Sequence, residues 1–283
     1  MIKRRFIPGE EWLYLKLYSG PKILEDILVG LYPEIKKLYS SGIINKFFFI
    51  RYIDEDYHLR LRFQLNDIRH TGLLIETLSL NLRNFSDSRI LSKVCYDTYN
   101  REIERYGSAT IEDAETLFCT SSWEILEIVS TEQDYTQRWL LGVKCMDHLL
   151  GTLGLTTKAK YELYQKCYLN LLNEFSENKI TSTELKQRYR TNSQAIEKMI
   201  TQKEHITVPN IDALQTTIAR LLDLEHQEQL EVTFDQFLFS IVHMHYNRLF
   251  RIKQRSHEFV IYYMMSNYYK SSVIREAKKE VLR

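Results

Sequence analysis

The sequence predicts an α+β protein that is mostly helical, with a small, mainly antiparallel sheet in residues 1–108 and a helical part in residues 109–283. Three observations lead to this prediction. Apolar and polar side chains alternate with the period of a strand at residues 12–18 and again at 58–64. Amphipathic helical segments dominate the chain after Gly107. Only four prolines and nine glycines interrupt the 283 residues, so long helices with few irregular loops are expected.

The first part of the chain contains six predicted elements in a recognisable order. They are a strand at 12–18, a helix at 21–39, strands at 45–52 and 58–65, a helix at 68–84 and an extended piece at 92–107. Pro21 suits the first turn of the first helix, because the fixed φ of proline matches the helix and its missing N–H is not needed there. The acidic segment "IDEDY" joins the two middle strands as a hairpin. This order of elements is the split βαβ arrangement of ferredoxin-like sheets.

The helical part carries three start signals of the capping-box type. In each, a threonine precedes an acidic residue or a glutamine by three positions: Thr110 with Asp113, Thr181 with Glu184, and Thr233 with Gln236. No segment rich in proline, serine and glycine separates the two parts of the chain. We therefore expect the parts to pack together as one domain.

Composition and charge exclude several classes of protein. The 38 basic and 37 acidic residues leave a net charge of +1, which gives no electrostatic footprint for nucleic acid or an anionic membrane. Neither a secretory signal nor a membrane-spanning segment is expected, because the N-terminus lacks an apolar core and no long uncharged apolar run occurs. The four cysteines lack metal-ligand spacing, which indicates reduced, mostly buried thiols in a cytoplasmic protein: Cys95, Cys119, Cys145 and Cys167. No nucleotide, hydrolase or zinc-protease motif occurs, so we expect neither a metal nor a cofactor.

The first candidate site lies on the predicted hairpin, in "FFFIRYIDEDYHLRLRFQL". His58, Arg60 and Arg62 share one face of a strand because alternate residues point the same way, and Arg51 lies on the preceding strand. A half-buried strand with a solvated outer face is the ordinary interpretation of this pattern. A cationic strand face that binds an anion is the functional interpretation.

The second candidate is "YNREIERYGS", in which Arg101 and Arg105 are four residues apart with Glu102 and Glu104 between them. Such residues often form a surface ion-pair patch worth about 0–1 kcal/mol per exposed pair, without functional meaning. Arginine also clamps carboxylates with two parallel hydrogen bonds. Both interpretations remain open at this point.

The third candidate is "FDQFLFSIVHMHYNRLFRI", an apolar helical segment at residues 234–252 that His243, His245, Asn247 and Arg248 interrupt. Burying these polar groups costs free energy unless each finds a partner, and a satisfied core histidine is the common outcome. Histidine is also the usual general base near neutral pH. From the residues alone, the sequence predicts an α+β protein with a candidate Arg/His anion site.

Four segments, in this order, resemble one protein family over nearly the whole chain: "EWLYLKLYSGP", "FFFIRYIDEDYHLRLRF", "YNREIERYG" and "HMHYNRL". They are similar to the C-terminal elimination domain of class I lantibiotic dehydratases, which also occurs as stand-alone thiopeptide-type bacteriocin biosynthesis proteins. Ser108 departs from the family pattern, in which we expect glycine.

The resemblance implies a lyase that removes glutamate from glutamylated Ser or Thr of a ribosomally made precursor peptide and leaves dehydroalanine or dehydrobutyrine. The chain is short for a complete dehydratase of this kind, so a separate glutamylating enzyme is the expected partner. Two alternatives remain. One is a [4+2] cycloaddition enzyme that forms the pyridine core of thiopeptides, and the other is a non-catalytic peptide-binding module.

The resemblance also assigns candidate residues. Arg62, Arg105 and His243 are the expected catalytic residues, the arginines acting on the glutamyl carboxylates and developing charge and the histidine on the proton. Alternates from the same segments and further substrate-binding candidates are Arg60, Arg101, His245, Arg51, His58 and Asn247.

Overall fold

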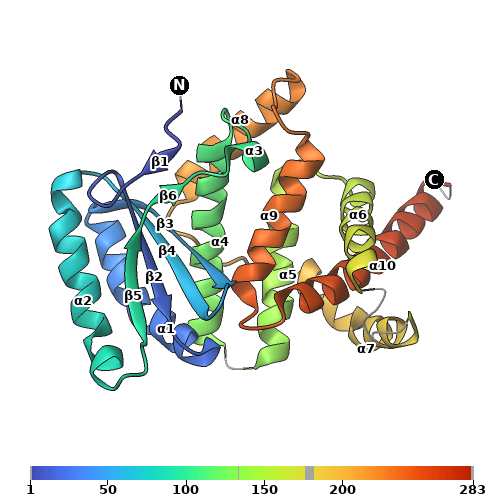
Figure 1. Ribbon diagram of the computed structural model, residues 1–283. Helices are drawn as coiled ribbons and strands as arrows, with labels where there is room; N and C mark the ends of the chain where they lie inside the picture. The colour runs from blue at the N-terminus through green and yellow to red at the C-terminus, as the bar shows by residue number, and fades with distance from the viewer. Residues whose placement is uncertain (1, 133, 176–181, 282–283) are drawn as a thin grey trace. The chain divides into compact units, whose positions relative to one another are not determined.

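The computed structural model describes residues 2–132, 134–175 and 182–281 (Figure 1). In chain order its strands are β1 (Arg5–Phe6), β2 (Trp12–Tyr18), β3 (Ile44–Ile53), β4 (Tyr57–Leu65), β5 (Lys93–Asp97) and β6 (Tyr99–Asn100). Its helices are α1 (Pro21–Ser40), α2 (Thr71–Asp87), α3 (Ile103–Tyr106), α4 (Ile111–Thr131), α5 (Tyr135–Thr152), α6 (Thr157–Phe175), α7 (Ser182–Thr201), α8 (Ile211–His226), α9 (Phe234–Leu249) and α10 (Gln254–Val281). The 3-10 turn Ile68–His70 precedes α2. The predicted α+β class with a helical majority is confirmed.

Four strands form one antiparallel sheet in the order β3-β4-β2-β5, and β1 pairs with β6 in a separate two-stranded ribbon. Along the chain, β2, α1, β3, β4, α2 and β5 follow the predicted order of strand, helix, strand, strand, helix, strand. The register places Arg62 of β4 between Tyr14 of β2 and Phe48 of β3. Because opposite residues of neighbouring strands lie on one face, these three side chains stand side by side.

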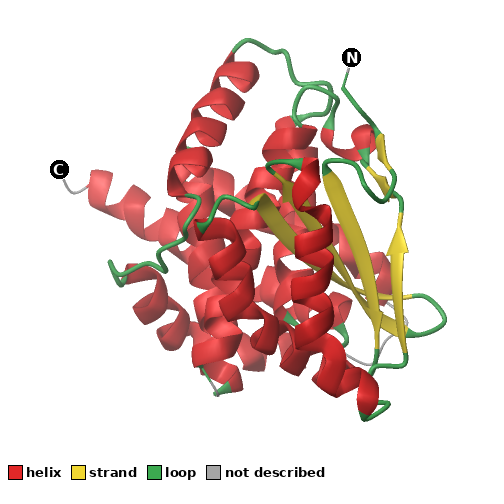
Figure 2. Ribbon diagram, turned by 90° about the vertical axis from the view of Figure 1, so that its left-hand side faces the viewer, coloured by secondary structure: helices red, strands yellow, loops and turns green. Residues whose placement is uncertain are grey.

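The two faces of the sheet differ in the way that the alternation predicts. One face is apolar and buried, and its residues include Leu13, Leu15, Leu17, Leu59, Leu61 and Phe63. Helix α1 packs on β3 and β4, and α4 packs on β3. Figure 2 shows the strands in yellow and the helices in red. The opposite face carries the half-buried Lys16 and Arg60 and the exposed Tyr52. The predicted cationic strand face is therefore present.

Helix α1 begins at Pro21 as predicted, and its apolar stripe is buried. The residues of this stripe include Leu24, Ile27, Leu28, Leu31, Ile35 and Leu38. Gly42 follows the helix with a φ of +70°, a conformation that residues with a Cβ rarely adopt. The bounds of α1, Pro21–Ser40, agree with the helix predicted at residues 21–39.

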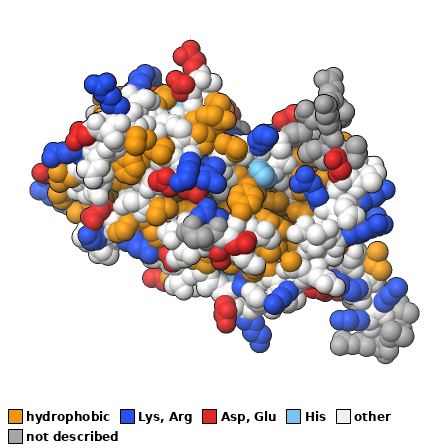
Figure 3. Space-filling model, turned by 90° about the horizontal axis from the view of Figure 1, so that it is seen from below, with side chains coloured by type: hydrophobic (Ala, Val, Ile, Leu, Met, Phe, Trp, Pro, Cys, Tyr) orange, Lys and Arg blue, Asp and Glu red, His pale blue; other side chains and the backbone are white. Residues whose placement is uncertain are grey.

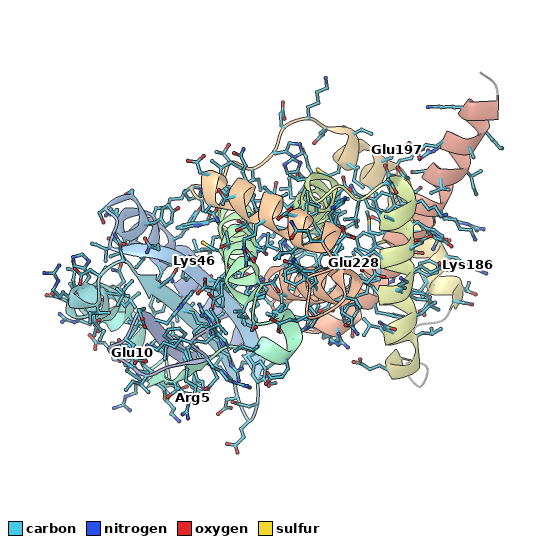
Figure 4. All side chains as sticks on the ribbon, turned by 90° about the horizontal axis from the view of Figure 1, so that it is seen from above. Arg5, Glu10, Lys46, Lys186, Glu197 and Glu228 are labelled. Carbon is cyan, nitrogen blue, oxygen red and sulfur yellow. The ribbon has the colours of Figure 1, made fainter. Side chains whose placement is uncertain are left out.

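Helix α4 covers the free edge of β3 and satisfies main-chain donors there (Figure 1). The N–H of Phe47 donates to Cys119 Sγ at 3.5 Å, and the N–H of Phe49 donates to Ser122 Oγ at 3.3 Å. Lys46, labelled in Figure 4, donates from the same strand to the main-chain oxygen of Glu112 at 2.8 Å. Side chains of a helix thus replace the missing neighbouring strand, which an edge strand needs when it is buried.

The chain divides into two compact units, Met1–Gln133 with Ile206–Ile252 and Asp134–His205 with Lys253–Arg283. This division does not follow the predicted change of character at residues 108 and 109. Local sequence pattern separates the sheet from the helices, whereas packing places α4, α8 and α9 in the unit that contains the sheet. Helices packed on a sheet share its core, whatever their distance along the chain.

The second unit consists of α5, α6, α7 and α10, and α10 packs along both α6 and α7. Its half-buried Asp147 on α5 accepts hydrogen bonds from Lys160 Nζ at 2.6 Å and from the Tyr269 hydroxyl. This ion pair links three helices of the unit.

Several local expectations need correction. The extended piece predicted at 92–107 breaks after Asp97, because β6 pairs with β1 and not with the four-stranded sheet, and residues 103–106 form the helical turn α3. Thr110 does not cap α4 with its side chain, since its hydroxyl donates to the main-chain oxygen of Tyr106. Thr233 does cap α9 and accepts from the Gln236 N–H at 3.3 Å. Thr181 lies outside the described residues.

Basic and acidic side chains are interspersed on the face drawn in Figure 3, as the net charge of +1 predicts. Within residues 2–132, 134–175 and 182–281, no helix is both long enough and apolar enough to cross a membrane. Three of the four thiols are buried, and Cys95 is half-buried.

Candidate functional site

A pocket lies within the first unit, where the sheet meets the β6–α3 segment, α4 and α9. The cavity itself has a volume of about 20 Å³, and it opens into a wider space of about 300 Å³ that includes solvent. Its lining residues are Phe48, Ile50, Arg62, Tyr99, Asn100, Glu102, Tyr106, Ile111, Phe118 and Met244. An apolar, largely aromatic wall with a few polar groups is the usual character of a small-molecule or peptide side-chain site.

Arg62 is the cation of this pocket, and it is only 6% exposed. Its guanidinium carbon lies 4.5 Å from the ring centre of Tyr14, 4.9 Å from that of Tyr99 and 5.3 Å from that of Phe48. Nε and Nη1 are buried and find no hydrogen-bond partner among the described residues. Aromatic faces attract a cation, but they do not replace the hydrogen bonds that a buried guanidinium loses with water. The arrangement is therefore suited to an anion that enters the pocket.

Arg101 has a different environment, although the sequence places it in the same segment as Arg105. Its Nε and Nη2 each donate at 2.8 Å to one carboxylate oxygen of the fully buried Glu115. The Tyr99 hydroxyl also donates to Glu115, at 2.8 Å. The guanidinium of Arg101 is thus neutralised by a two-point ion pair that holds the wall of the pocket at Tyr99.

Arg105 links α3 to α9. Its Nε donates to the Ser240 hydroxyl at 3.1 Å, and its Nη1 lies 3.5 Å from a carboxylate oxygen of Glu102. Glu102 and the adjacent Tyr106 line the pocket, whereas Arg105 is not among the lining residues. Arg105 is only partly buried, so its ion pair with Glu102 contributes little to stability.

His243 lies on α9 between two contacts of that helix. It follows Ser240 by one turn and precedes Asn247 by one turn, and all three residues share one side of the helix. The next residue, Met244, lines the pocket, while His243 is half-buried and is not among the lining residues. Of Arg62, Arg105 and His243, only Arg62 is a lining residue of the pocket.

His245, the alternate of His243, is a core residue. Its Nδ1 lies 2.9 Å from the Ser121 hydroxyl on α4, and its side chain is buried. This is the satisfied core histidine that the ordinary interpretation of the segment predicts. The two histidines of "HMHYN" therefore differ in burial, since His243 is half-buried and His245 is buried.

Asn247 and Arg51 connect α9 to the edge strand β3. The main-chain N–H of Arg51 donates to Asn247 Oδ1 at 3.1 Å, and Asn247 Nδ2 donates back to the Arg51 carbonyl at 3.0 Å. The Arg51 guanidinium donates to the Arg248 carbonyl at 2.8 Å and to Glu25 at 2.9 Å. These contacts join elements of the scaffold, and the residues do not line the pocket.

Arg248 was not a candidate from the sequence, yet it is fully buried beside the same edge. Its Nε donates to the Phe49 carbonyl and its Nη1 to the Met244 carbonyl, both at 2.8 Å. Burial lowers the pKa of Arg248 to about 9. The only signal in the sequence is an arginine at the end of an otherwise apolar helical face.

His58 and Arg60 form a cluster further along β4, about 13 Å and about 7 Å from Arg62 at about 3.3 Å per residue. The buried His58 ring stacks on Tyr18 with ring centres 4.6 Å apart, and Arg60 Nε donates to His58 Nε2 at 3.1 Å. The Arg60 guanidinium lies 3.4 Å from the ring centre of Tyr52. Burial lowers the pKa of His58, which agrees with a neutral ring that accepts from Arg60.

Ser108, the departure from the family pattern, anchors the loop before α9. The main-chain N–H groups of Ser108 and Ala109 donate to the Glu231 carboxylate at 2.8 Å and 3.1 Å, and the Ser108 hydroxyl donates as well. Gly107 has a φ of +81°, and a Cβ there would lie 2.9 Å from Thr110 Oγ1. The turn that follows Tyr106 therefore needs glycine at position 107.

No group of three or more side chains that could hold a metal ion occurs within the described ranges of the chain. The aromatic lining, by contrast, was not predicted from the sequence, because Phe48, Tyr99 and Phe118 look like ordinary core residues there. Phe48 could have been found from the predicted hairpin, since it lies opposite Arg62 in the register.

Comparison with known proteins gives consistent matches. The nisin biosynthesis protein NisB of Lactococcus lactis subsp. lactis is 28% identical over 277 residues, which cover 95% of this chain and 26% of NisB. The chain thus spans about a quarter of the length of this relative. The crystal structure of the tRNA-dependent lantibiotic dehydratase MibB from Microbispora sp. 107891 shares the fold with a TM-score of 0.66 at 18% identity, over 95% of this chain and 29% of MibB. The pyridine synthase TbtD from thiomuracin biosynthesis shares it with a TM-score of 0.56 at 14% identity, over 93% of this chain and 98% of TbtD.

The family described as "Lantibiotic biosynthesis dehydratase C-term" matches residues 12–269, a range that includes the whole sheet, the pocket and α9. The chain therefore belongs to the lantibiotic biosynthesis dehydratase C-terminal family.

Proposed function

We propose that the protein catalyses β-elimination of glutamate from glutamylated Ser or Thr of a precursor peptide, giving dehydroalanine or dehydrobutyrine. The observation that carries the proposal is the buried Arg62 guanidinium, whose Nε and Nη1 lack partners in a pocket walled by aromatic rings. A glutamyl ester brings free carboxylate oxygens, and the departing group becomes a carboxylate as well. Guanidinium–carboxylate pairing is the strongest hydrogen-bonded match that such a cation finds.

The reaction breaks the Cα–H and Cβ–O bonds and forms the second bond between Cα and Cβ. A base takes the Cα proton, the electron pair of that C–H bond forms the Cα–Cβ double bond, and the Cβ–O bond breaks with its electron pair on the departing glutamate. In this proposal Arg62 binds the carboxylate and stabilises the charge that develops during departure. His243, which is half-buried and next to the pocket residue Met244 in the sequence, takes the proton in this proposal.

Arg105 has a positioning role in this proposal. Its hydrogen bond to Ser240 joins α3, which carries Tyr106, to the turn of α9 that precedes His243. A reacting group has to be held within a few tenths of an ångström to be effective. A hydrogen bond that holds the two elements together should therefore increase the rate of elimination. Arg101 has a similar positioning role, because its ion pair with Glu115 holds Tyr99 in the pocket wall.

The partners in this proposal are a ribosomally made precursor peptide and a separate glutamylating enzyme. NisB is named for nisin biosynthesis and MibB is described as a tRNA-dependent lantibiotic dehydratase, so peptide modification is the common theme of the relatives. In this proposal the substrate reaches Arg62 already esterified with glutamate.

The test is incubation of the purified protein with a precursor peptide esterified by glutamate at a single serine. We expect the glutamyl adduct to be replaced by a species one water lighter than the unmodified peptide, as read by mass spectrometry. Heat-inactivated protein is the control for spontaneous loss of the ester. Adducts that persist with active, folded protein would contradict the proposal.

A second candidate is a [4+2] cycloaddition that joins two dehydroalanines into a pyridine ring. It is retained because the pyridine synthase TbtD shares the fold over almost its whole length, although at 14% identity this likeness concerns the fold alone. A cycloaddition of dehydroalanines releases no glutamate, so it gives the buried, unpaired Arg62 no obvious partner. Cyclisation of a peptide that already carries two dehydroalanines would favour this candidate.

A further inference from the structure

Tyr106 is a second polar residue of the pocket, and it has no role in the reaction described above. It is 2% exposed and lines the pocket with Arg62. Its ring packs edge-on against Phe118, with ring centres 5.2 Å apart, and against Phe237, with ring centres 6.2 Å apart. These contacts fix the ring in one orientation.

The hydroxyl of Tyr106 differs from that of the neighbouring Tyr99. Tyr99 donates its hydroxyl to Glu115, so that donor is already used. The Tyr106 hydroxyl makes no hydrogen bond to any residue in the described part of the chain. The hydroxyl is not among the buried atoms that lack a partner, so it is accessible from solvent although the residue as a whole is 2% exposed. A substrate group that enters the pocket can therefore accept a hydrogen bond from it.

The protonation state of Tyr106 favours a donor over a base. Burial raises the pKa of the phenol above its ordinary value, and the Glu102 carboxylate acts in the same direction, whereas Arg105, Arg248 and Arg62 act in the opposite direction. The phenol is therefore neutral near pH 7 and presents an O–H group. Its surroundings are electropositive, with the Arg105 guanidinium carbon 5.5 Å from the ring centre.

We propose that Tyr106 is a catalytic residue that donates a hydrogen bond to the substrate oxygen on which negative charge collects when the Cα proton is removed. This inference rests on the proposed elimination. It assigns different roles to the Arg62 guanidinium and to the Tyr106 hydroxyl. The permanently charged Arg62 matches the glutamyl carboxylate, while a neutral O–H matches the carbonyl oxygen of the reacting residue as it becomes enolate-like. No proton is transferred from Tyr106, which only stabilises charge, so the balance of the elimination is unchanged.

The experiment compares Tyr106→Phe with the wild-type protein on a singly glutamylated peptide. The substitution removes one oxygen and keeps the ring contacts with Phe118 and Phe237. We expect kcat to fall by about 10²- to 10³-fold, as when one oxyanion donor is lost, with KM changed only a few-fold. The matched control is Tyr39→Phe, which also removes a tyrosine hydroxyl, from a residue that packs on Trp123 and does not line the pocket. The control should keep the wild-type kcat.

A second measurement separates donation from a structural role. Replacing Tyr106 with difluorotyrosine lowers the intrinsic pKa of the phenol and leaves its packing nearly unchanged. If the O–H donates, the rate should fall at high pH, and this fall should begin at lower pH in the fluorinated protein than in the wild type. A tyrosine that acts only by packing would give superimposable pH profiles.

The possible failures are distinguishable. If the wild-type protein eliminates glutamate and folded Tyr106→Phe does so at the same rate, this inference is wrong and the proposed function stands. If the wild-type protein does not eliminate glutamate at all, the proposed function and this inference fall together.

Discussion

Asn247 of α9 pairs with the main chain of Arg51 on β3 through two hydrogen bonds, one accepted at 3.1 Å and one donated at 3.0 Å. The side-chain amide thus occupies the place of a neighbouring strand at the edge of the sheet. Because the two partners fit in only one register, they fix both the height and the rotation of α9. The positions of His243, one turn earlier, and of Met244 in the pocket wall therefore depend on this contact.

We predict that Asn247→Ala lowers the free energy of unfolding by about 1–3 kcal/mol, because the buried Arg51 N–H and C=O both lose their partner. Elimination should slow as well, since α9 is no longer held in register. Asn247→Asp keeps the acceptor but loses the donor, so its effect on stability should differ from that of alanine. Urea denaturation measures the stability. If Asn247→Ala unfolds at the same urea concentration as the wild type, the contact does not contribute to stability.

The two histidines of α9 should give opposite results. His243→Ala should slow elimination by about 10²- to 10⁴-fold, the usual contribution of positioned proton transfer, and should change stability little because the side chain is half-buried. His245→Ala should lower the free energy of unfolding by about 1–3 kcal/mol, because the buried Ser121 hydroxyl loses its partner. Its effect on the rate should be smaller.

Both variants are assayed with a glutamylated peptide under conditions in which each is fully folded by circular dichroism. If His245→Ala abolishes elimination while His243→Ala does not, the roles of the two histidines are reversed. Asn is a useful additional substitution at His245, because it keeps a hydrogen-bonding side chain opposite Ser121.

The parts of the fold that the sequence predicts are those that depend on local periodicity. Alternation at residues 12–18 and 58–64 predicts β2 and β4, and the apolar stripe after Pro21 predicts α1. Residues 103–106 were expected to be extended, but they form a helical turn. The strand before them ends early because β6 pairs with β1, and this pairing joins segments about 95 residues apart, which leaves no local signal in the sequence. Non-local pairings of this kind decide where a strand ends.

The same limit explains the candidate site. Arg101 and Arg105 look alike in the sequence, and only the position of Glu115 on α4 shows that one is locked in an ion pair. Arg62 was a candidate from strand alternation, but its missing partners depend on side chains from β2, β3 and β6. Periodicity thus predicts the face on which a residue lies, whereas partner identity depends on the tertiary fold.

Stability should fall in mildly acidic solution because of His58. Burial lowers the pKa of this histidine in the folded protein, so between the folded and the unfolded value, about 6.5, the unfolded chain binds more protons. The stabilising contribution of the neutral ring is therefore present above about pH 6.5 and is lost as the pH falls towards and through the folded pKa. His58→Gln should weaken the dependence of the free energy of unfolding on pH in this range.

The measurement is urea denaturation from pH 5 to pH 8 for the wild type and for His58→Gln. His148 and His257 also have pKa values lowered by burial, so the difference between the two proteins, and not the slope itself, reports on His58. Parallel stability curves for the two proteins would contradict the assignment.

The sharpest prediction concerns the two buried arginines of the pocket region, because one has a counter-ion and the other does not. Arg101→Met should lower the free energy of unfolding by about 3–5 kcal/mol, since the buried Glu115 carboxylate loses its partner. Arg62→Met should leave the free energy of unfolding unchanged or raise it, because the substitution removes an uncompensated buried cation from among aromatic rings. The same Arg62→Met protein should eliminate glutamate about 10²- to 10³-fold more slowly, as expected when a charge-stabilising donor is lost. Thermal or urea unfolding together with the peptide mass assay gives both quantities. An Arg62→Met protein that is strongly destabilised, or that keeps the wild-type rate, would show that Arg62 is a structural cation and not the anion-binding group of the site.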